Sequence, residues 1–408
     1  MINRIFIFAL LIFFALGCSK DAHMIGQSNA FIKFYGGFNV NLSSHLALNK
    51  NGGYGLVGTY GTVENKNQIY ILNTDENGIT QWQKLIGGKG NDAGKDLKVD
   101  NDGNFVVLAD SSYNSVIDST VFYLIKISPQ GNVLWSKAYG LNTRIQQSQS
   151  LLIVSDGYIM MGHSLVGSNQ EILLIKTDFN GKFLWQKFYD VKSLPDVITS
   201  IQATADNNFI WSGGEDRYRG PGPIPANVFF NARVTNTNQA GDILFDRTYL
   251  SLTSQSYGDN IANEIKIING GYIIIGTASV SSGAPTENKD IFVLSIFNDG
   301  SVNWNKTYGS STSNDYGQSI ALTNDGGFLI CGSTNTTNNK YDVYLDKIDG
   351  SGNPLWNIPK TFGGINDDFG QSVLQSQDGG VVVLATINYS NIPVLSLIKT
   401  NSLGELKK

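Results

Sequence analysis

Short stretches in which apolar and polar residues alternate recur along the chain. Residues 341–348 (YDVYLDKI) alternate in this way, and the apolar stretch 327–333 (GFLICGS) precedes them. Such patterns are typical of β-strands. Two glycine-rich segments, NDGG and DGSG, connect these strands to their neighbours and accept the backbone conformations of tight hairpin turns. The pattern therefore predicts four antiparallel strands, in the segments 318–322, 327–333, 341–348 and 355–362.

The same four-stranded unit repeats with a period of about fifty residues, which is a period typical of propeller blades. Each unit ends in a variant of Trp-x-Lys-x-Tyr-Gly. The seven copies of this joint begin at Phe31, Trp82, Trp135, Trp185, Phe245, Trp304 and Trp356. An aromatic residue at one place in every unit is typical of packing between neighbouring sheets, and we favour this role over a cofactor or sugar platform. The chain is therefore predicted to be an all-β, seven-bladed propeller of four-stranded antiparallel blades.

The two ends of the repeat array complement each other. The last unit ends at Lys408 without a fourth strand, whereas residues 31–35 (FIKFY) match a fourth strand that has no unit before it. We therefore expect this N-terminal segment to pair with residues 394–400 in the last blade and to close the ring. The propeller domain would then span residues 31–408.

The repeats also carry two family resemblances. The pattern Asp178-x-x-Gly181-x-x-x-Trp185 is similar to the repeats of quinoprotein-like (PQQ-type) propellers. Residues 31–408 as a whole more closely resemble the tandem propeller-repeat lipoproteins of Gram-negative bacteria. One outer-membrane assembly factor is a lipoprotein propeller that acts as a scaffold, so the resemblance implies the fold and a binding role. Quinoprotein enzymes usually have eight blades and a charged, metal-bearing cofactor pocket, which we do not expect here.

Residues 1–17 resemble a lipoprotein signal peptide. Arg4 is followed by an apolar run that is too short to span a membrane as a helix. The run ends in Ala-Leu-Gly-Cys18, which resembles the lipobox of bacterial lipoproteins; the alternative is an ordinary secretory signal. The resemblance implies lipidation of Cys18 and a tether over residues 18–30. Because Ser19 rather than Asp follows the cysteine, it also implies the outer membrane or cell surface.

Composition argues against several classes of function. The formal net charge is −5 and no basic run occurs, which argues against a nucleic-acid partner. The only histidines are His23, His45 and His163, which lie far apart in the sequence, so a zinc site or a Ser-His-Asp triad has little material. If Cys18 is lipidated, no intramolecular disulfide is available, and Cys331 in its apolar strand is predicted to be a core residue.

Function is expected on the face that carries the long loops. In a four-stranded blade the second-to-third loops and the blade-to-blade connections share one face, and here they include segments 213–226 and 279–289. Variable loops on a rigid scaffold commonly carry binding sites. Within the first segment, Arg217, Tyr218 and Arg219 form the most distinctive candidate patch, because Arg and Tyr are enriched in interfaces. An insertion without a partner is the alternative.

Aligning the units reveals a second candidate site. Each unit has Asp, Asn or Gln where the chain enters its innermost strand, at the channel mouth. The acidic members are Asp92, Asp196, Asp315 and Asp368, and the others are Asn41, Gln146 and Asn260. One interpretation is structural, because a short polar side chain accepts hydrogen bonds from backbone N–H groups in Asx-turns. The other is an acidic collar that binds a divalent cation or a cationic ligand group. Apart from such a cation, we expect no cofactor.

Two functions are compatible with these features. The first is a monomeric, non-enzymatic binding or scaffold lipoprotein that is anchored to the membrane and engages a protein or a glycan through its long-loop face. The second is a polysaccharide lyase or hydrolase that acts at the channel mouth with carboxylates, of which a hydrolase needs two at a defined separation. The scarcity of histidine and the absence of a catalytic motif favour binding.

Overall fold

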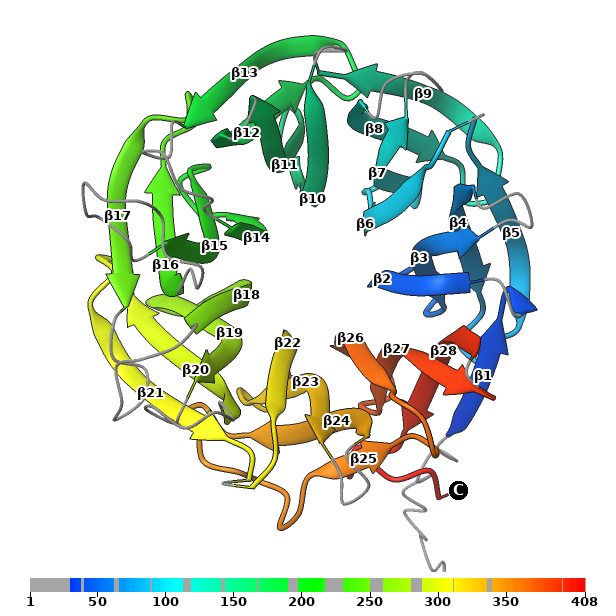
Figure 1. The fold of residues 1–408 in the computed structure, drawn as a ribbon, viewed down its shortest axis with the longest axis vertical. Helices are drawn as coiled ribbons and strands as arrows, with labels where there is room; N and C mark the ends of the chain where they lie inside the picture. Colours follow the sequence, from blue (N-terminus) through cyan, green and yellow to red (C-terminus); the bar gives the residue numbers. More distant parts are fainter. Residues whose placement is uncertain are drawn as a thin grey trace, which may run out of the picture.

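The computed structural model describes residues 30–407, apart from 38–39, 62–65, 89, 113–118, 141–143, 167–168, 190–196, 217–229, 250–259, 280–287, 311, 336–339 and 391. Within these residues the chain forms seven four-stranded antiparallel sheets that stand as blades around a central channel (Figure 1). This is the predicted seven-bladed, all-β propeller. Across the described ranges, no helix is both long and apolar enough to cross a membrane.

Six blades are built from consecutive strands. Blade 1 comprises β2 (Val40–Leu48), β3 (Tyr54–Gly61), β4 (Asn67–Thr74) and β5 (Thr80–Ile86); blade 2 comprises β6 (Ala93–Val99), β7 (Phe105–Ser112), β8 (Thr120–Ile127) and β9 (Val133–Tyr139). Blade 3 comprises β10 (Ile145–Val154), β11 (Gly157–Val166), β12 (Asn169–Thr177) and β13 (Phe183–Tyr189); blade 4 comprises β14 (Val197–Ala203), β15 (Phe209–Asp216), β16 (Phe230–Thr237) and β17 (Ile243–Tyr249). Blade 5 comprises β18 (Asn260–Ile268), β19 (Gly271–Ser279), β20 (Lys289–Phe297) and β21 (Val302–Tyr308); blade 6 comprises β22 (Asp315–Leu322), β23 (Phe328–Asn335), β24 (Tyr341–Ile348) and β25 (Lys360–Phe362).

Blade 7 joins the two ends of the chain, as predicted. It comprises β26 (Phe369–Gln375), β27 (Val381–Tyr389), β28 (Ile392–Thr400) and, as its outermost strand, β1 (Phe31–Tyr35). β1 pairs antiparallel with β28, with Phe31 opposite Lys399 and Tyr35 opposite Leu395. The N-terminal strand therefore completes the last blade and removes its open edge.

The outer strand of blade 6 is shorter than expected. Residues 355–362 were predicted as a strand, but only Lys360–Phe362 (β25) pairs with β24, and residues 355–358 form bends. Pro354 and Pro359 lack the N–H that a strand needs, and this joint has two more residues between its Trp and its Lys than the other joints.

The joint residues connect each blade to the next. Joint tyrosines donate their hydroxyl to a glycine carbonyl in the third-to-fourth turn of the following blade, at 2.6–2.8 Å, in the pairs Tyr35–Gly78, Tyr139–Gly181, Tyr189–Gly241, Tyr249–Gly300 and Tyr308–Gly352. Gly181 has φ +70°, and a Cβ there would lie 2.8 Å from the Tyr139 hydroxyl and 3.0 Å from the Trp135 ring. Both the turn and this close approach therefore require glycine. Trp82 meets Phe105 edge-on at 5.1 Å, which supports the packing role of the joint aromatics.

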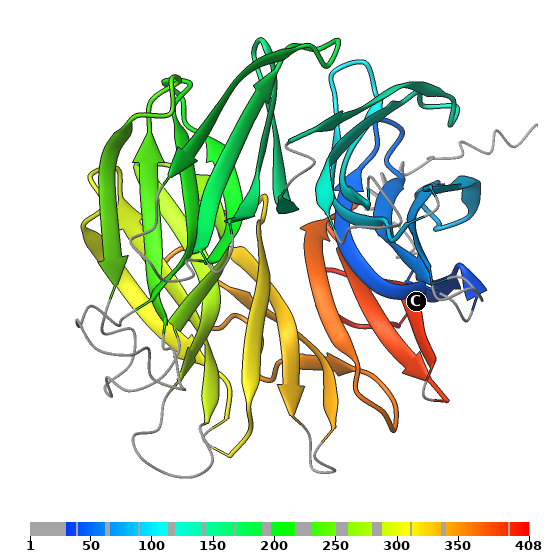
Figure 2. The same ribbon diagram turned by 45° about the horizontal axis from the view of Figure 1, so that its top comes forward.

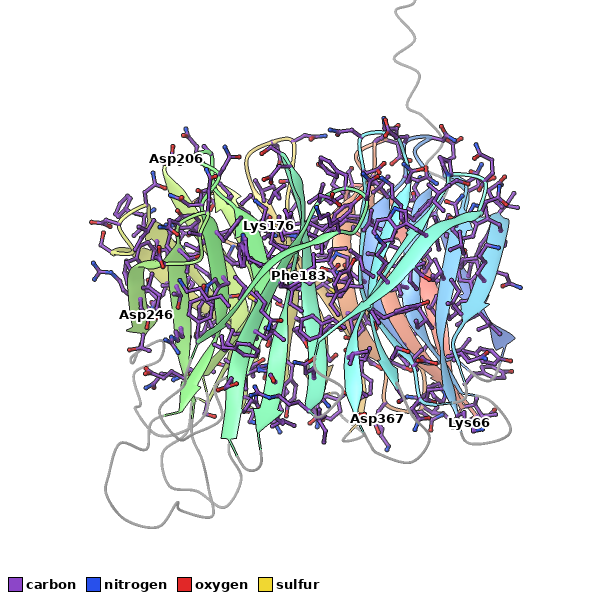
Figure 3. All side chains as sticks on the ribbon, turned by 90° about the horizontal axis from the view of Figure 1, so that it is seen from above. Lys66, Lys176, Phe183, Asp206, Asp246 and Asp367 are labelled. Carbon is purple, nitrogen blue, oxygen red and sulfur yellow. The ribbon has the colours of Figure 1, made fainter. Side chains whose placement is uncertain are left out.

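The core lies between the blades. Seven clusters of buried apolar residues each contain side chains from two neighbouring blades, including the cluster of blades 7 and 1 that contains Tyr35, Leu46 and Val382. The blades twist from their inner to their outer strands (Figure 2). Figure 3 shows the two faces at opposite edges: Asp206 lies in a tight turn on one face, and Lys66 and Asp367 lie on the long-loop face.

Candidate ligand-binding cleft and channel

Every inner strand carries a β-bulge at the equivalent position. One extra residue interrupts the pairing of each inner strand with the second strand of its blade. The extra residues are Ser44, Lys95, Gln149, Thr199, Asn263, Gln318 and Gln371, and all of them line the central channel. The channel cavity at this level measures about 140 Å³. The bulges therefore set which side chains a molecule in the channel meets.

Four of the seven bulge side chains bind within the propeller itself. Lys95 Nζ lies 3.2 Å from Asp110 Oδ2. The other three donate to a backbone carbonyl of the next blade: Ser44 Oγ to Gly94 O at 2.8 Å, Thr199 Oγ1 to Ala262 O at 2.7 Å, and Asn263 Nδ2 to Gly317 O at 2.6 Å. These contacts join inner strands of neighbouring blades, so the fold itself accounts for these residues.

In four blades the residue after the bulge forms a second set of contacts with the next blade. Here a side-chain oxygen accepts the N–H of the inner strand of the next blade: Asp96 Oδ2 from Leu151 at 2.7 Å, Ser150 Oγ from Ile201 at 3.4 Å, Glu264 Oε2 from Ile320 at 2.8 Å, and Ser319 Oγ from Val373 at 3.1 Å. A bulge leaves backbone groups without a partner in the strand ladder, and these side-chain oxygens bind the N–H groups concerned. We call this set of contacts the inter-blade belt.

The charged side chains of the channel are paired. Lys98 Nζ lies 2.8 Å from Asp96 Oδ1, and Lys266 Nζ lies 2.6 Å from Glu264 Oε1. Burial is the main cause that lowers the pKa of His45 to about 4, so its imidazole is neutral at pH 7, with Nε2 3.1 Å from Lys98 Nζ. Because these charges already have partners, the channel suits a neutral polar molecule better than an ion.

Three bulge side chains have no role in the fold. Within the described residues, no side chain or backbone group hydrogen-bonds to the amides of Gln149, Gln318 or Gln371, although all three project into the channel. An amide can donate and accept hydrogen bonds at the same time. These three amides are therefore available to a ligand.

An aromatic cleft lies at the long-loop end of blades 6 and 7. Tyr316 of β22, Tyr341 of β24 and Phe369 of β26 line it together with Ser333, and its volume is about 300 Å³. The rings of Tyr316 and Tyr341 have centroids 5.6 Å apart at 71°, and those of Tyr341 and Phe369 are 5.9 Å apart at 29°. Lys289 Nζ lies 5.8 Å from the centroid of the Tyr316 ring. We call this space the aromatic cleft.

The aromatic cleft and the channel are adjoining parts of one site. Gln318 and Gln371 line both of them. A molecule that packs against the rings therefore also meets two free amides at the entrance to the channel. Apolar surface with a few convergent polar groups is the common composition of a ligand site.

The predicted collar residues bind backbone groups at separate joints. Asp92, Asp315 and Asp368 are each at most 1% exposed. The Oδ2 atom of each accepts an N–H from the connection that precedes it, from Gly88 at 2.7 Å, from Ser310 at 2.8 Å and from Gly364 at 2.7 Å, respectively. This is the Asx-type role that was the structural interpretation. Asp368 Oδ1 also accepts the Asn388 N–H at 2.6 Å.

No hydrogen bond or ion pair joins two of these aspartates, and the part of the chain that the structure describes contains no group of three or more His, Cys, Asp or Glu placed to hold a metal ion. The cation-binding role of the collar stays a prediction. Cys18, Asp196 and the Arg217, Tyr218 and Arg219 patch lie outside the described residues.

The structure adds two carboxyl groups that the alignment of units did not single out. Asp342 Oδ1 and Asp368 Oδ2 lie side by side at the joint of blades 6 and 7, within 2.1 and 2.6 Å of where a Cβ on Gly363 would be. At the joint of blades 5 and 6, burial and then the charge of Asp315 raise the pKa of Asp290 to about 6. A sequence signal for these two carboxyl groups exists. The third strand of a blade has an acidic residue at its second position in β20 and β24.

The aromatic cleft was not predicted from the sequence. A signal for it exists in the aligned units, because the residue after the collar position is aromatic only in the last two units, as Tyr316 and Phe369. Such a departure from a repeat marks a residue that the shared fold does not require.

The fold recurs in solved structures of low sequence identity. No protein-family model and no curated protein matches the chain. A polysaccharide lyase of family PL25, an ulvan lyase bound to -[GlcA(1-4)Rha3S]-, is similar with a TM-score of 0.54 and 12% identity, over 94% of this chain and 97% of that chain. An α-L-arabinanase of Penicillium chrysogenum in complex with arabinobiose has a TM-score of 0.49 and 12% identity, over 75% and 92%. At 12% identity, the likeness to the ulvan lyase shows the fold alone.

Proposed function

We propose that this propeller is a lipid-anchored, non-enzymatic glycan-binding protein of the outer membrane or cell surface, and that the aromatic cleft holds the sugar. The main support is that three aromatic rings and two free amides line the same cleft. The rings are those of Tyr316, Tyr341 and Phe369, and the amides are those of Gln318 and Gln371. Aromatic faces offer apolar surface of the shape of a sugar ring, and glutamine amides pair with hydroxyl groups.

The lining of the aromatic cleft favours binding over catalysis. Apart from the two tyrosines, none of the described residues that line it carries a titratable side chain. The carboxylates next in the chain, Asp315 and Asp368, accept backbone N–H groups instead. A lyase or hydrolase needs an acid and a base within reach of the sugar. The ulvan lyase of the same fold was solved with a bound oligosaccharide, which agrees with a glycan as ligand for either function.

The position of β1 favours an orientation on the membrane. Phe31, its first residue, packs against the Gly78 turn on the tight-turn face. A lipid on Cys18 would be joined to this face by residues 19–30, which reach at most about 40 Å when extended. The aromatic cleft opens on the opposite face, so in this arrangement it points away from the membrane.

A panel of polysaccharides tests the proposal. The protein with Cys18→Ser, which is expected to leave the membrane fraction and to keep the whole propeller, is titrated with laminarin, arabinan, xylan, polygalacturonate and ulvan. Tyr341→Ala should weaken binding about fivefold, because it removes one stacked ring worth ~1 kcal/mol. The matched control is Tyr123→Ala, since the Tyr123 hydroxyl donates to Ser136 Oγ at 2.7 Å outside the cleft.

The proposal fails if the wild-type propeller retains none of these polysaccharides, or if Tyr341→Ala and Tyr123→Ala bind equally well. Release of products from any of the polysaccharides would instead favour the lyase or hydrolase.

A further inference from the structure

The channel behind the aromatic cleft has the size of a single sugar unit. Its cavity of about 140 Å³ has room for on the order of ten water molecules. The inner strands of the seven blades stand in a ring around this cavity (Figure 1). A chain that enters from the aromatic cleft can therefore place its end here, whereas its interior cannot cross the ring.

The three free glutamines are placed to recognise such an end. Gln318 and Gln371 lie on the side of the cleft, in blades 6 and 7, and Gln149 lies in blade 3 and lines the same cavity. They occupy the bulge position at which Ser44, Thr199 and Asn263 bind the next blade. Because the fold uses this position elsewhere and leaves it free here, the three amides are candidates for ligand contacts.

We propose that the site binds the end of a neutral glycan, with the terminal sugar in the channel among Gln149, Gln318 and Gln371 and the next units on the rings of the aromatic cleft. This rests on the proposed function and specifies its ligand. The channel ion pairs leave no charge to meet an acidic terminal sugar. Each amide offers donors and an acceptor to neighbouring hydroxyl groups, and a terminal unit has more free hydroxyl groups than an internal one.

Stoichiometry against chain length separates end binding from binding along the chain. The full chain with Cys18→Ser is titrated calorimetrically with size-fractionated laminarin and arabinan, from the trisaccharide to the polymer. End binding predicts a constant number of protein molecules per glycan chain at every length. A number that rises in proportion to chain length overturns the inference, although the proposed glycan-binding function would stand. Absence of binding to both glycans at all lengths, in this assay and in the wider panel, overturns the proposed function and the inference with it.

Gln149→Ala provides the second arm of the test. It should weaken binding of the trisaccharide by roughly two- to tenfold, as expected for one lost hydrogen bond, and leave the melting temperature unchanged. Gln130→Ala, in an exposed turn on the opposite face, is the matched control and should change neither quantity. Equal trisaccharide affinities of the wild type and Gln149→Ala would show that the terminal sugar does not reach the channel.

Discussion

Asp290 and Asp315 bring two carboxyl groups from neighbouring blades to one joint. Asp315 is 1% exposed and accepts the Ser310 N–H, but its Oδ1 atom and that of Asp290 have no hydrogen-bond partner among the described residues. Aligning the units predicted a polar residue at 315 because that position repeats along the chain. Asp290 was not predicted, because its closeness to Asp315 arises only when blade 5 packs against blade 6.

Asp290→Asn should stabilise the protein at high pH. Burial and the neighbouring charge raise the pKa of Asp290 from 3.8 to about 6, so the stability linked to its protonated form is present at low pH and is lost as the pH rises through 6. The variant should therefore melt at a higher temperature than the wild type at pH 8, and the difference should shrink as the pH falls below 6. Scanning calorimetry at pH 5 and pH 8 measures it.

Asp367→Asn is the control of opposite sign. The Tyr341 N–H and Lys340 lower the pKa of Asp367, so its ionised form stabilises the fold above its unfolded pKa, and this variant should melt at a lower temperature at pH 8. A lower melting temperature of Asp290→Asn at pH 8 would show that its carboxylate is stabilising instead.

At the scale of elements, the inter-blade belt uses two kinds of acceptor after the bulge, a serine hydroxyl and a carboxylate. Serine is sufficient in blades 3 and 6, where Ser150 and Ser319 each accept one N–H. Glu264 does more, because its Oε2 accepts both the Ile320 N–H and the Ser319 hydroxyl, and its Oε1 binds Lys266. Burial alone would raise the pKa of Glu264, but Lys266 and the Ile320 N–H are among the groups that outweigh burial and lower it.

Glu264→Ala should destabilise the propeller by about 3 kcal/mol, because it leaves the Ile320 N–H and the Lys266 ammonium without their partner. The double variant Glu264→Ser with Lys266→Gln replaces the carboxylate with a hydroxyl acceptor, as in Ser150 and Ser319, and removes the unpaired ammonium, so it should recover most of the loss. Urea unfolding of the three proteins measures the difference. If the double variant is as unstable as Glu264→Ala, the belt does not act through an interchangeable acceptor.

The strands and turns were predictable, but the bulges were not. Alternation of apolar and polar residues and the Asn/Asp-Gly turns located β22, β23 and β24, because both depend on the local sequence. The bulge at Gln318 has no such signal, since it depends on how β22 pairs with β23. The shortened β25 follows from Pro354 and Pro359, which are a sequence signal against a continuous strand.

For the whole molecule, the repeat determines the ring, and departures from the repeat form the candidate site. The number of blades and the closing strand follow from the seven joints and the incomplete last unit. The aromatic cleft combines Tyr316, Tyr341 and Phe369 from three strands of two blades, so no single stretch of sequence contains it. Repetition shows what the fold needs, and positions that depart from it are candidates for ligand contacts.

Closure of the ring by β1 gives a prediction about the molecule as a unit. β1 adds a fourth strand to blade 7, and it binds blade 1 through Tyr35, which donates to Gly78 O at 2.7 Å, and Lys33, which donates to Asn77 O at 2.5 Å. Internal joints use the same contact, as in Tyr139 and Gly181. Without β1, blades 7 and 1 lose this connection, and β28 becomes an open strand edge.

Deleting residues 24–36 should therefore lower the melting temperature of the whole propeller, on the order of 10 °C, because one pairing of strands and two inter-blade hydrogen bonds are lost together. The exposed edge of β28 should also promote self-association, which light scattering detects, because an unpaired edge pairs with other chains. Deleting residues 24–29 alone is the control and should leave the melt unchanged. A synthetic peptide of residues 30–37 added to the truncated protein should restore part of the lost stability. If the truncated protein melts as the wild type does, the other six joints hold the ring without β1.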